Sequence, residues 1–259
     1  MAEKKMEEAV VLSQEEIASG IFSMWIHVPE ISAQAAPGQF VSLYCRDASR
    51  LLPRPISICE IDGEMGNLRL VYRIAGKGTQ EFSSYEPGSR LQVMGPLGNG
   101  FPKERCPEGK TALLIGGGIG IPPLVELAQQ IQGQSLVVAG YRNEQFLTRE
   151  LSASGSLYVA TEDGSAGTQG TVLDCIRENG LKADVIYSCG PLPMLRAVKE
   201  FALENGIECW ISMEERMACG IGACLGCVCK SVETDAHLGV KNKRVCKEGP
   251  VFRAEEVEL

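Results

Sequence analysis

Cysteines are concentrated in one glycine-rich stretch, M-A-C-G-I-G-A-C-L-G-C-V-C-K, at residues 217–230. Three of them, Cys219, Cys224 and Cys227, follow the spacing C-x4-C-x2-C. This is the plant-type spacing for three thiolate ligands of a [2Fe–2S] cluster, whose fourth ligand comes from farther along the chain. Cys246, in R-V-C-K-E-G-P, is the expected fourth thiolate. The intervening glycines allow the backbone to adopt positive φ and to direct amides at the cluster sulfurs.

Two alternatives remain open for this loop. Zinc sites tend to contain paired C-x2-C units, and the loop contains one such unit, Cys224 to Cys227. Cys229 lies two residues beyond Cys227, and in an extended segment its side chain points to the opposite side. The expected ligand set is therefore Cys219, Cys224, Cys227 and Cys246, without Cys229.

A second candidate site is a glycine turn between an apolar run and a helix-like segment. The run L-L-I at residues 113–115 leads into G-G-G-I-G, and Pro122 follows closely. Connections of this kind direct backbone N–H groups and the positive end of a helix towards a phosphate. The full G-x-G-x-x-G pattern is absent because Ile121 stands at its last position, so a plain tight connection is the alternative. The candidate nucleotide-binding residues are Gly116, Gly117, Gly118 and Gly120.

Two further apolar runs end in residues suited to ligand contact. Ligands of open α/β sheets bind at the carboxyl ends of the strands. The run that ends at Cys189, Gly190 and Pro191 would therefore adjoin the nucleotide, with Cys189 as a candidate reactive thiol. Glu162 and Asp163 end another run, where acids would accept ribose hydroxyls and disfavour the extra phosphate of NADP. A solvated turn is the alternative for these two acids.

The elements that must position these residues fall into three parts. Up to about residue 104, short apolar runs such as IFSMWIHV and LRLVYRI are separated by turn residues, a pattern typical of a small antiparallel barrel. Residues 105–210 alternate apolar strands with helical stretches, as βαβ units on a parallel sheet do. The expected fold is multi-domain: an antiparallel β-barrel at 1–104, an α/β nucleotide-binding domain at 105–210, and a small iron–sulfur segment at 211–259.

Composition narrows the possible partners and the compartment. The formal charge of −8 on 259 residues argues against a nucleic-acid partner. The first residues lack the apolar core of a signal peptide, and no run approaches the roughly 18 apolar residues of a membrane span. We therefore expect a cytoplasmic protein with reduced thiols and no membrane partner. Residues expected to be inert or structural are Cys45, Cys59, Cys106, Cys175, Cys209, His27 and His237.

An ordered set of short motifs identifies a family. Arg54-Pro55-Ile56-Ser57 is followed by V-Y-R-I at 71–74, G-K-G-T at 76–79 and G-P-L-G at 95–98, all before the glycine turn. This order resembles the ferredoxin-reductase superfamily, in which a flavin-binding barrel precedes a pyridine-nucleotide domain. With its cysteine loop and the terminal R-V-C-K-E-G-P-V-F, nearly the whole chain resembles the iron–sulfur flavoprotein electron-transfer subunits of NAD-dependent (class 1B) dihydroorotate dehydrogenases.

The resemblance implies where FAD and NAD would bind. FAD would contact Arg54 through its phosphates and Ser57 near flavin N5, and the chemistry agrees, since a guanidinium fork suits a pyrophosphate and a hydroxyl can tune the flavin ring. The remaining implied flavin contacts are Pro55, Ile56, Tyr72, Arg73, Ile74, Gly78 and Thr79. NAD would lie between the glycine turn and residues 189–191, and Ser57 and Cys189 would be the catalytic residues.

The resemblance also implies a partner. A separate FMN-containing catalytic subunit would oxidise dihydroorotate to orotate in pyrimidine synthesis, in a heterotetramer with two subunits of each kind. Electrons would pass from that FMN through the [2Fe–2S] cluster and FAD to NAD. The alternative within the superfamily is a reductase subunit of a sulfide dehydrogenase or a ferredoxin–NADP transhydrogenase, in some of which an aspartate replaces the first cluster cysteine; Cys219 favours the dihydroorotate system. A metal-stabilised binding module without enzymatic function would be colourless.

Overall fold

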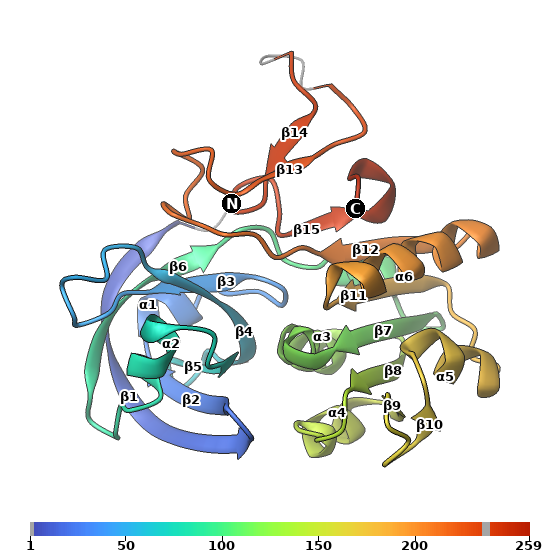
Figure 1. Cartoon of the computed structure of the whole chain (residues 1–259), viewed down its shortest axis with the longest axis horizontal. Helices are drawn as coiled ribbons and strands as arrows, with labels where there is room; N and C mark the ends of the chain where they lie inside the picture. Colours follow the sequence, from blue (N-terminus) through green and yellow to red (C-terminus); the bar gives the residue numbers. More distant parts are fainter. Residues whose placement is uncertain (1–2, 235–238) are drawn as a thin grey trace.

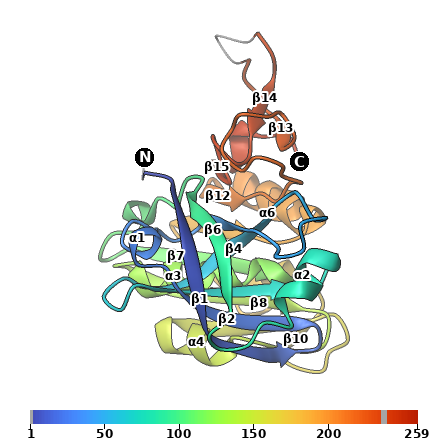
Figure 2. The same ribbon diagram turned by 90° about the vertical axis from the view of Figure 1, so that its left-hand side faces the viewer.

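The computed structural model describes residues 3–234 and 239–259 of the chain, so His237 lies outside the described residues. A β-barrel and a helix-covered sheet lie side by side, and the C-terminal segment lies over the junction between them (Figure 1). In both views the hairpin β13–β14 projects beyond the barrel and the sheet (Figure 1 and Figure 2). None of the described helices is long and apolar enough to cross a membrane.

The N-terminal part forms a closed antiparallel barrel with the strand order β1-β2-β5-β4-β3-β6, as predicted. Alternation along the strands explains its core, because successive side chains point to opposite faces. In β5, for example, Leu68, Leu70 and Tyr72 are buried inside the barrel. The elements are β1 (Lys5–Ala18), β2 (Ile21–His27), α1 (Pro29–Ser32), β3 (Phe40–Leu43), β4 (Arg54–Asp62), β5 (Asn67–Arg73), α2 (Lys77–Phe82) and β6 (Arg90–Leu97).

The second part is a sheet of seven strands in the order β10-β9-β8-β7-β11-β12-β15. Its strands are parallel except for β15, which runs antiparallel to β12. The elements are η1 (Lys103–Arg105), β7 (Thr111–Gly117), η2 (Gly118–Gly120), α3 (Pro122–Gln130), β8 (Gln134–Tyr141), α4 (Thr148–Ser154), β9 (Ser156–Thr161), β10 (Thr168–Gln169), α5 (Val172–Glu178), β11 (Val185–Cys189), α6 (Leu192–Asn205), β12 (Glu208–Ser212) and β15 (Val251–Arg253). The predicted parallel α/β sheet is confirmed.

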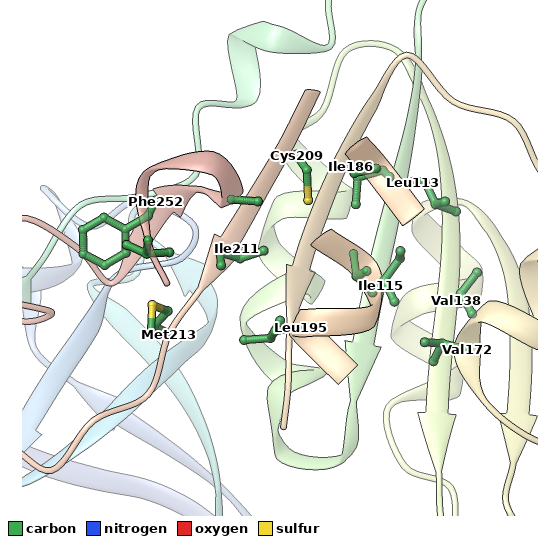
Figure 3. Close-up of a cluster of buried hydrophobic side chains, with 14 of the residues drawn as sticks. Leu113, Ile115, Val138, Val172, Ile186, Leu195, Cys209, Ile211, Met213 and Phe252 are labelled. Atoms are coloured by element: carbon green, nitrogen blue, oxygen red, sulfur yellow. The ribbon is translucent and has the colours of Figure 1, made fainter. Parts of the chain in front are cut away.

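Helices cover both faces of this sheet. Helices α5 and α6 pack on the face that carries Leu113 and Ile115 of β7, and this core extends to Phe252 of β15 (Figure 3). Helices α3 and α4 pack on the opposite face, against Leu114 and its neighbours. That second core also contains Cys59 of the barrel, so α3 joins the two domains.

The C-terminal segment consists of the hairpin β13 (Val228–Lys230) and β14 (Asn242–Arg244), then β15 and η3 (Ala254–Glu256). It is tied to the sheet because Phe252 of β15 pairs with Ile211 of β12. The expected boundary between residues 210 and 211 falls inside β12. The segment therefore shares its core with the α/β domain.

Candidate functional site

The strand order places a topological switch point between β7 and β11. β8 lies on one side of β7 and β11 on the other, so the connections that leave β7 and β11 diverge. Open α/β sheets bind ligands at such a point, outside the carboxyl ends of the strands. Gly116 pairs with Cys189 across the two strands, so the glycine turn and residues 189–191 adjoin each other there.

Close backbone approach explains the glycines of this turn. A Cβ atom on Gly120 would lie 2.3 Å from the carbonyl oxygen of Cys189, a separation no side chain allows. Gly118 has a φ of +53°, in the left-handed region that glycine adopts without a steric cost. A Cβ atom on Gly117 would meet the Met194 sulfur at 2.6 Å, beside Pro191. The glycine turn, Gly190 and Pro191 thus lie together at the start of α6.

Arg73 of the barrel reaches the glycine turn from the other domain. It ends β5, is exposed, and its Nη2 atom lies 3.3 Å from the position that a Cβ atom on Gly118 would occupy. The alternation of side chains along β5 and β4 is consistent with this position of Arg73. Val71 and Cys59 point out of the barrel and belong to the core shared with α3. Ser57 lies on the same outer face of β4 as Cys59. Flavin and nucleotide candidates from the two domains therefore face each other.

Cys189 ends β11, with only 1% of its surface exposed. Burial raises the pKa of its thiol, and the nearby carboxylate of Glu214 raises it further. The thiol is therefore neutral at physiological pH and suited to packing against a ligand rather than to nucleophilic attack.

Glu214 is a candidate that the sequence interpretation missed. Its side chain reaches solvent. Partial desolvation nevertheless raises the pKa of its carboxyl group, and the positive charge of Arg73 offsets part of this increase. It lies two residues beyond Ser212, the end of β12, which adjoins β11. A survey of the residues that follow every parallel strand would have found it.

Arg54 and the first turn of α2 form a second polar site on the barrel. A Cβ atom on Gly78 would lie 2.4 Å from Arg54 Nε, so the guanidinium group rests directly on the helix backbone. The Thr79 hydroxyl accepts hydrogen bonds from the N–H groups of Ala75 (2.9 Å) and Gly76 (3.2 Å) and thereby orders the turn before the helix. A guanidinium group beside the start of a helix, where N–H groups lack partners within the helix, suits a phosphate.

Some of the expected flavin residues have side chains that point into the barrel core. Tyr72 is 2% exposed and packs inside the barrel against Phe22 and Phe82, where its hydroxyl accepts a hydrogen bond from Gln14. Burial raises the pKa of Tyr72 to about 12. Ile56 also belongs to the barrel core, and Ile74 is half-buried beyond the end of β5. Flavin contacts by Tyr72 and Ile56 would therefore come from their backbone.

Backbone N–H groups point at three of the four expected ligand sulfurs. Cys224 N lies 3.3 Å from Cys219 Sγ, Gly222 N lies 3.2 Å from Cys246 Sγ, and Cys246 N lies 3.4 Å from Cys227 Sγ. Although burial raises the pKa of Cys219, donors such as the Cys224 N–H lower it to about 6. Such donors stabilise the thiolates that bind iron.

The four sulfurs form two pairs. The Cys219 and Cys224 thiols influence each other's charge, and so do those of Cys246 and Cys227. In the described parts of the chain, no three His, Cys, Asp or Glu side chains are arranged to hold one metal ion. Two cysteine pairs suit a cluster of two irons, each with two protein ligands. Cys229 lies on β13 opposite Lys243, and its exclusion from the ligand set stays a prediction.

The cysteine loop packs on the barrel next to the Arg54 to Ser57 motif. A Cβ atom on Gly220 would lie 3.0 Å from Ser42 Oγ in β3 and 3.3 Å from Leu97 in β6. Ser42 in turn pairs with Pro55 of β4, and Phe40 of β3 pairs with Ser57. A single strand, β3, thus separates the cysteine loop from the expected flavin motif.

The chain is similar to known proteins over its full length. Residues 214–258 match the family of the iron–sulfur cluster binding domain of dihydroorotate dehydrogenase B, and residues 8–101 match the oxidoreductase FAD-binding domain. Two relatives are named dihydroorotate dehydrogenase B (NAD(+)), electron transfer subunit. That of Geobacillus thermodenitrificans is 44% identical over 259 residues, which cover 98% of each chain. That of Listeria monocytogenes is 45% identical over 257 residues, 97% of this chain and 98% of its own.

Among solved structures, that of an NADH-dependent reduced ferredoxin–NADP oxidoreductase superposes with a TM-score of 0.84 at 30% sequence identity. The match covers 96% of this chain and 89% of that one. That structure gave insights into flavin-based electron bifurcation. The similarity therefore includes all three parts of the fold.

Proposed function

The chain belongs to the family of electron transfer subunits of dihydroorotate dehydrogenase B (NAD(+)), and we propose that it passes electrons from the FMN of a separate catalytic subunit to NAD+ in pyrimidine biosynthesis. The observation that carries this proposal is the single strand β3 between the cysteine loop and the Arg54 to Ser57 motif. Neighbouring strands lie only about 4.8 Å apart, so a cluster and a flavin held by these residues would be close.

Both cofactors fit the residues that would hold them. The paired sulfurs of Cys219, Cys224, Cys227 and Cys246 would bind a [2Fe–2S] cluster, and Arg54 with the start of α2 would bind the phosphates of FAD. When bound, FAD exchanges two electrons with NAD as a hydride, whereas a [2Fe–2S] cluster exchanges one electron at a time. The chain would thus connect one-electron and two-electron chemistry.

The protein's own contribution is to align the two reactive rings. Ser57 on the outer face of β4 and Arg73 at the end of β5 would border the flavin. The glycine turn, Gly190 and Pro191 would hold NAD from the opposite domain, with the neutral thiol of Cys189 next to them at the end of β11. The carboxylate of Glu214 interacts electrostatically with both Arg73 and Cys189 and would be a further ionisable group at this site.

The partner would bind over the cysteine loop. Ile221 is 38% exposed and Leu225 is 67% exposed, so two large apolar side chains flank the expected ligands Cys219, Cys224 and Cys227. Exposed apolar side chains of this kind are typical of protein interfaces. We propose a heterotetramer with two copies of each subunit.

The test is a coupled anaerobic assay. The chain is purified with a candidate FMN-containing catalytic subunit, dihydroorotate and NAD+ are added, and NADH formation is followed with the visible spectrum. Cys224→Ser should abolish coupled turnover while FAD stays bound. Cys175→Ser is the matched control, because this cysteine lies in α5, outside the expected ligand set.

The outcomes separate this function from the alternative. Turnover that requires this chain, with flavin and iron–sulfur bands bleached by dihydroorotate, supports the proposal. Normal coupled turnover in Cys224→Ser contradicts the route through the cluster. A coloured wild-type protein that oxidises NADH but neither binds the partner nor supports turnover would favour the alternative, a reductase subunit of a sulfide dehydrogenase or a ferredoxin–NADP transhydrogenase. The 30% identical structure is that of a ferredoxin–NADP oxidoreductase.

A further inference from the structure

Arg244 connects the two parts of the chain that carry the expected cluster ligands. It ends β14, two residues before Cys246, and its Nη1 atom donates a hydrogen bond of 2.8 Å to the carbonyl oxygen of Gly222 in the cysteine loop. Its Nε and Nη2 atoms bind both carboxylate oxygens of Glu248, at 3.0 and 2.5 Å. Glu248 also accepts the backbone N–H of Arg244 at 2.7 Å. The guanidinium group is therefore fixed by three contacts rather than mobile.

Gly222 shows what this contact controls. Its N–H group lies 3.2 Å from Cys246 Sγ, while its carbonyl group is held by Arg244. Its φ of +83° is in the left-handed region, and a Cβ atom there would lie 2.6 Å from the Lys247 side chain. The loop thus leaves little room at this residue, and Arg244 holds the peptide group that directly follows the N–H pointing at the Cys246 sulfur.

The position of the charge has an electrostatic consequence. Only 24% of the Arg244 side chain and 33% of the Glu248 side chain are exposed, so solvent screens them less than fully exposed residues. The Arg244 guanidinium is close enough to Cys246 and Cys227 to interact with the charge on their sulfurs. The opposing carboxylate of Glu248 weakens that effect without removing it.

We propose that Arg244 is a positioning residue that raises the reduction potential of the [2Fe–2S] cluster, and that Glu248 sets the size of this effect. This inference rests on the proposed function. Reduction adds one electron, and hence one negative charge, to the cluster. A neighbouring positive charge stabilises the reduced form, whereas a neighbouring negative charge destabilises it. Arg244 and Glu248 therefore act with opposite signs.

The experiment is an anaerobic redox titration of the purified, cofactor-loaded protein with dithionite, followed by the EPR signal of the reduced cluster. Arg244→Gln should lower the ratio of reduced to oxidised cluster at a given potential about tenfold, which for one electron corresponds to about 59 mV. Glu248→Gln keeps an oxygen acceptor for Arg244 and should shift the potential in the opposite direction. Arg244→Lys keeps the charge and should stay near wild type, but should release iron to a chelator faster because the fork to Gly222 and Glu248 is lost.

Arg177→Gln is the matched control, because Arg177 also pairs with an acid, Asp174, but on the exposed surface of α5. Its midpoint potential should equal that of wild type. An unchanged potential in Arg244→Gln, or shifts of the same sign in Arg244→Gln and Glu248→Gln, would overturn the inference. If Arg244→Gln holds no cluster, Glu248→Gln decides alone: a higher potential supports the inference, and an equal or lower one overturns it.

A failure of this inference can be distinguished from a failure of the proposed function. A wild-type protein without a [2Fe–2S] signal would overturn the proposed function itself. A wild-type protein that carries the cluster and supports coupled turnover, with variants whose potentials do not move, would overturn only the role of Arg244.

Discussion

Replacing Gly78 with alanine should separate FAD binding from folding. The new Cβ atom would lie 2.4 Å from Arg54 Nε and within 3.0 Å of its guanidinium carbon. Because these atoms belong to the end of a flexible side chain, Arg54 moves away and the backbone of α2 stays in place. The expected structural change is therefore confined to the guanidinium group that would bind the FAD phosphates.

The magnitude follows from this displacement. A hydrogen bond to a charged group contributes about 1.5–3 kcal/mol, so loss of the Arg54 contact should weaken FAD binding about 10- to 150-fold. Alanine is a better helix former than glycine by about 0.5–1 kcal/mol, which offsets the cost of moving Arg54. The free energy of unfolding of the flavin-free protein should therefore stay within about 1 kcal/mol of wild type.

The assay is a fluorescence titration of the flavin-free chain with FAD, combined with denaturant unfolding of the same sample. Gln80→Ala, an exposed substitution in the same helix, is the control and should bind FAD as wild type does. Arg54→Ala should weaken binding to a similar extent, and the double variant Arg54→Ala, Gly78→Ala should add little. Wild-type affinity in Gly78→Ala would refute the reasoning, and so would additive losses in the double variant.

Three further predictions concern the cluster, the nucleotide and the interface between the domains. Cys229→Ser should keep the visible absorption of the cluster and Cys246→Ser should lose it; the reverse pattern would show that the ligand set is wrong. Glu162→Arg should raise the KM for NAD+ and lower that for NADP+ in steady-state assays, and an unchanged preference would place the ribose elsewhere. Burial raises the pKa of Glu126 in α3 above its usual value of 4.5. An acid whose pKa is higher in the folded than in the unfolded protein lowers the stability of the fold as the pH rises above the unfolded value. Glu126→Gln should therefore gain stability relative to wild type in denaturant unfolding between about pH 4.5 and neutral pH, and a difference that does not widen with pH would contradict this.

The local chemistry of this protein could be predicted from its sequence. Cys219, Cys224 and Cys227 are close in the chain, so short-range backbone geometry already brings them near one another. The same holds for the glycine turn after β7, where the strand and the helix follow directly on each other. The sequence also predicted the barrel and the parallel sheet. Strands buried on one face alternate apolar and polar residues, whereas strands buried on both faces are continuous apolar runs.

The relation between the sites depended on the tertiary structure. The packing of Gly220 on Ser42, the approach of Arg73 to Gly118 and the position of Glu214 near Cys189 each join residues from different elements. The inward side chain of Tyr72 also differs from what its place in a cofactor motif suggests. Such contacts result from the packing of the whole barrel against the whole sheet, a sum of many weak interactions that no short stretch of sequence records. The sequence therefore determined which chemistry the chain carries, and the tertiary structure decided how close the parts of that chemistry lie.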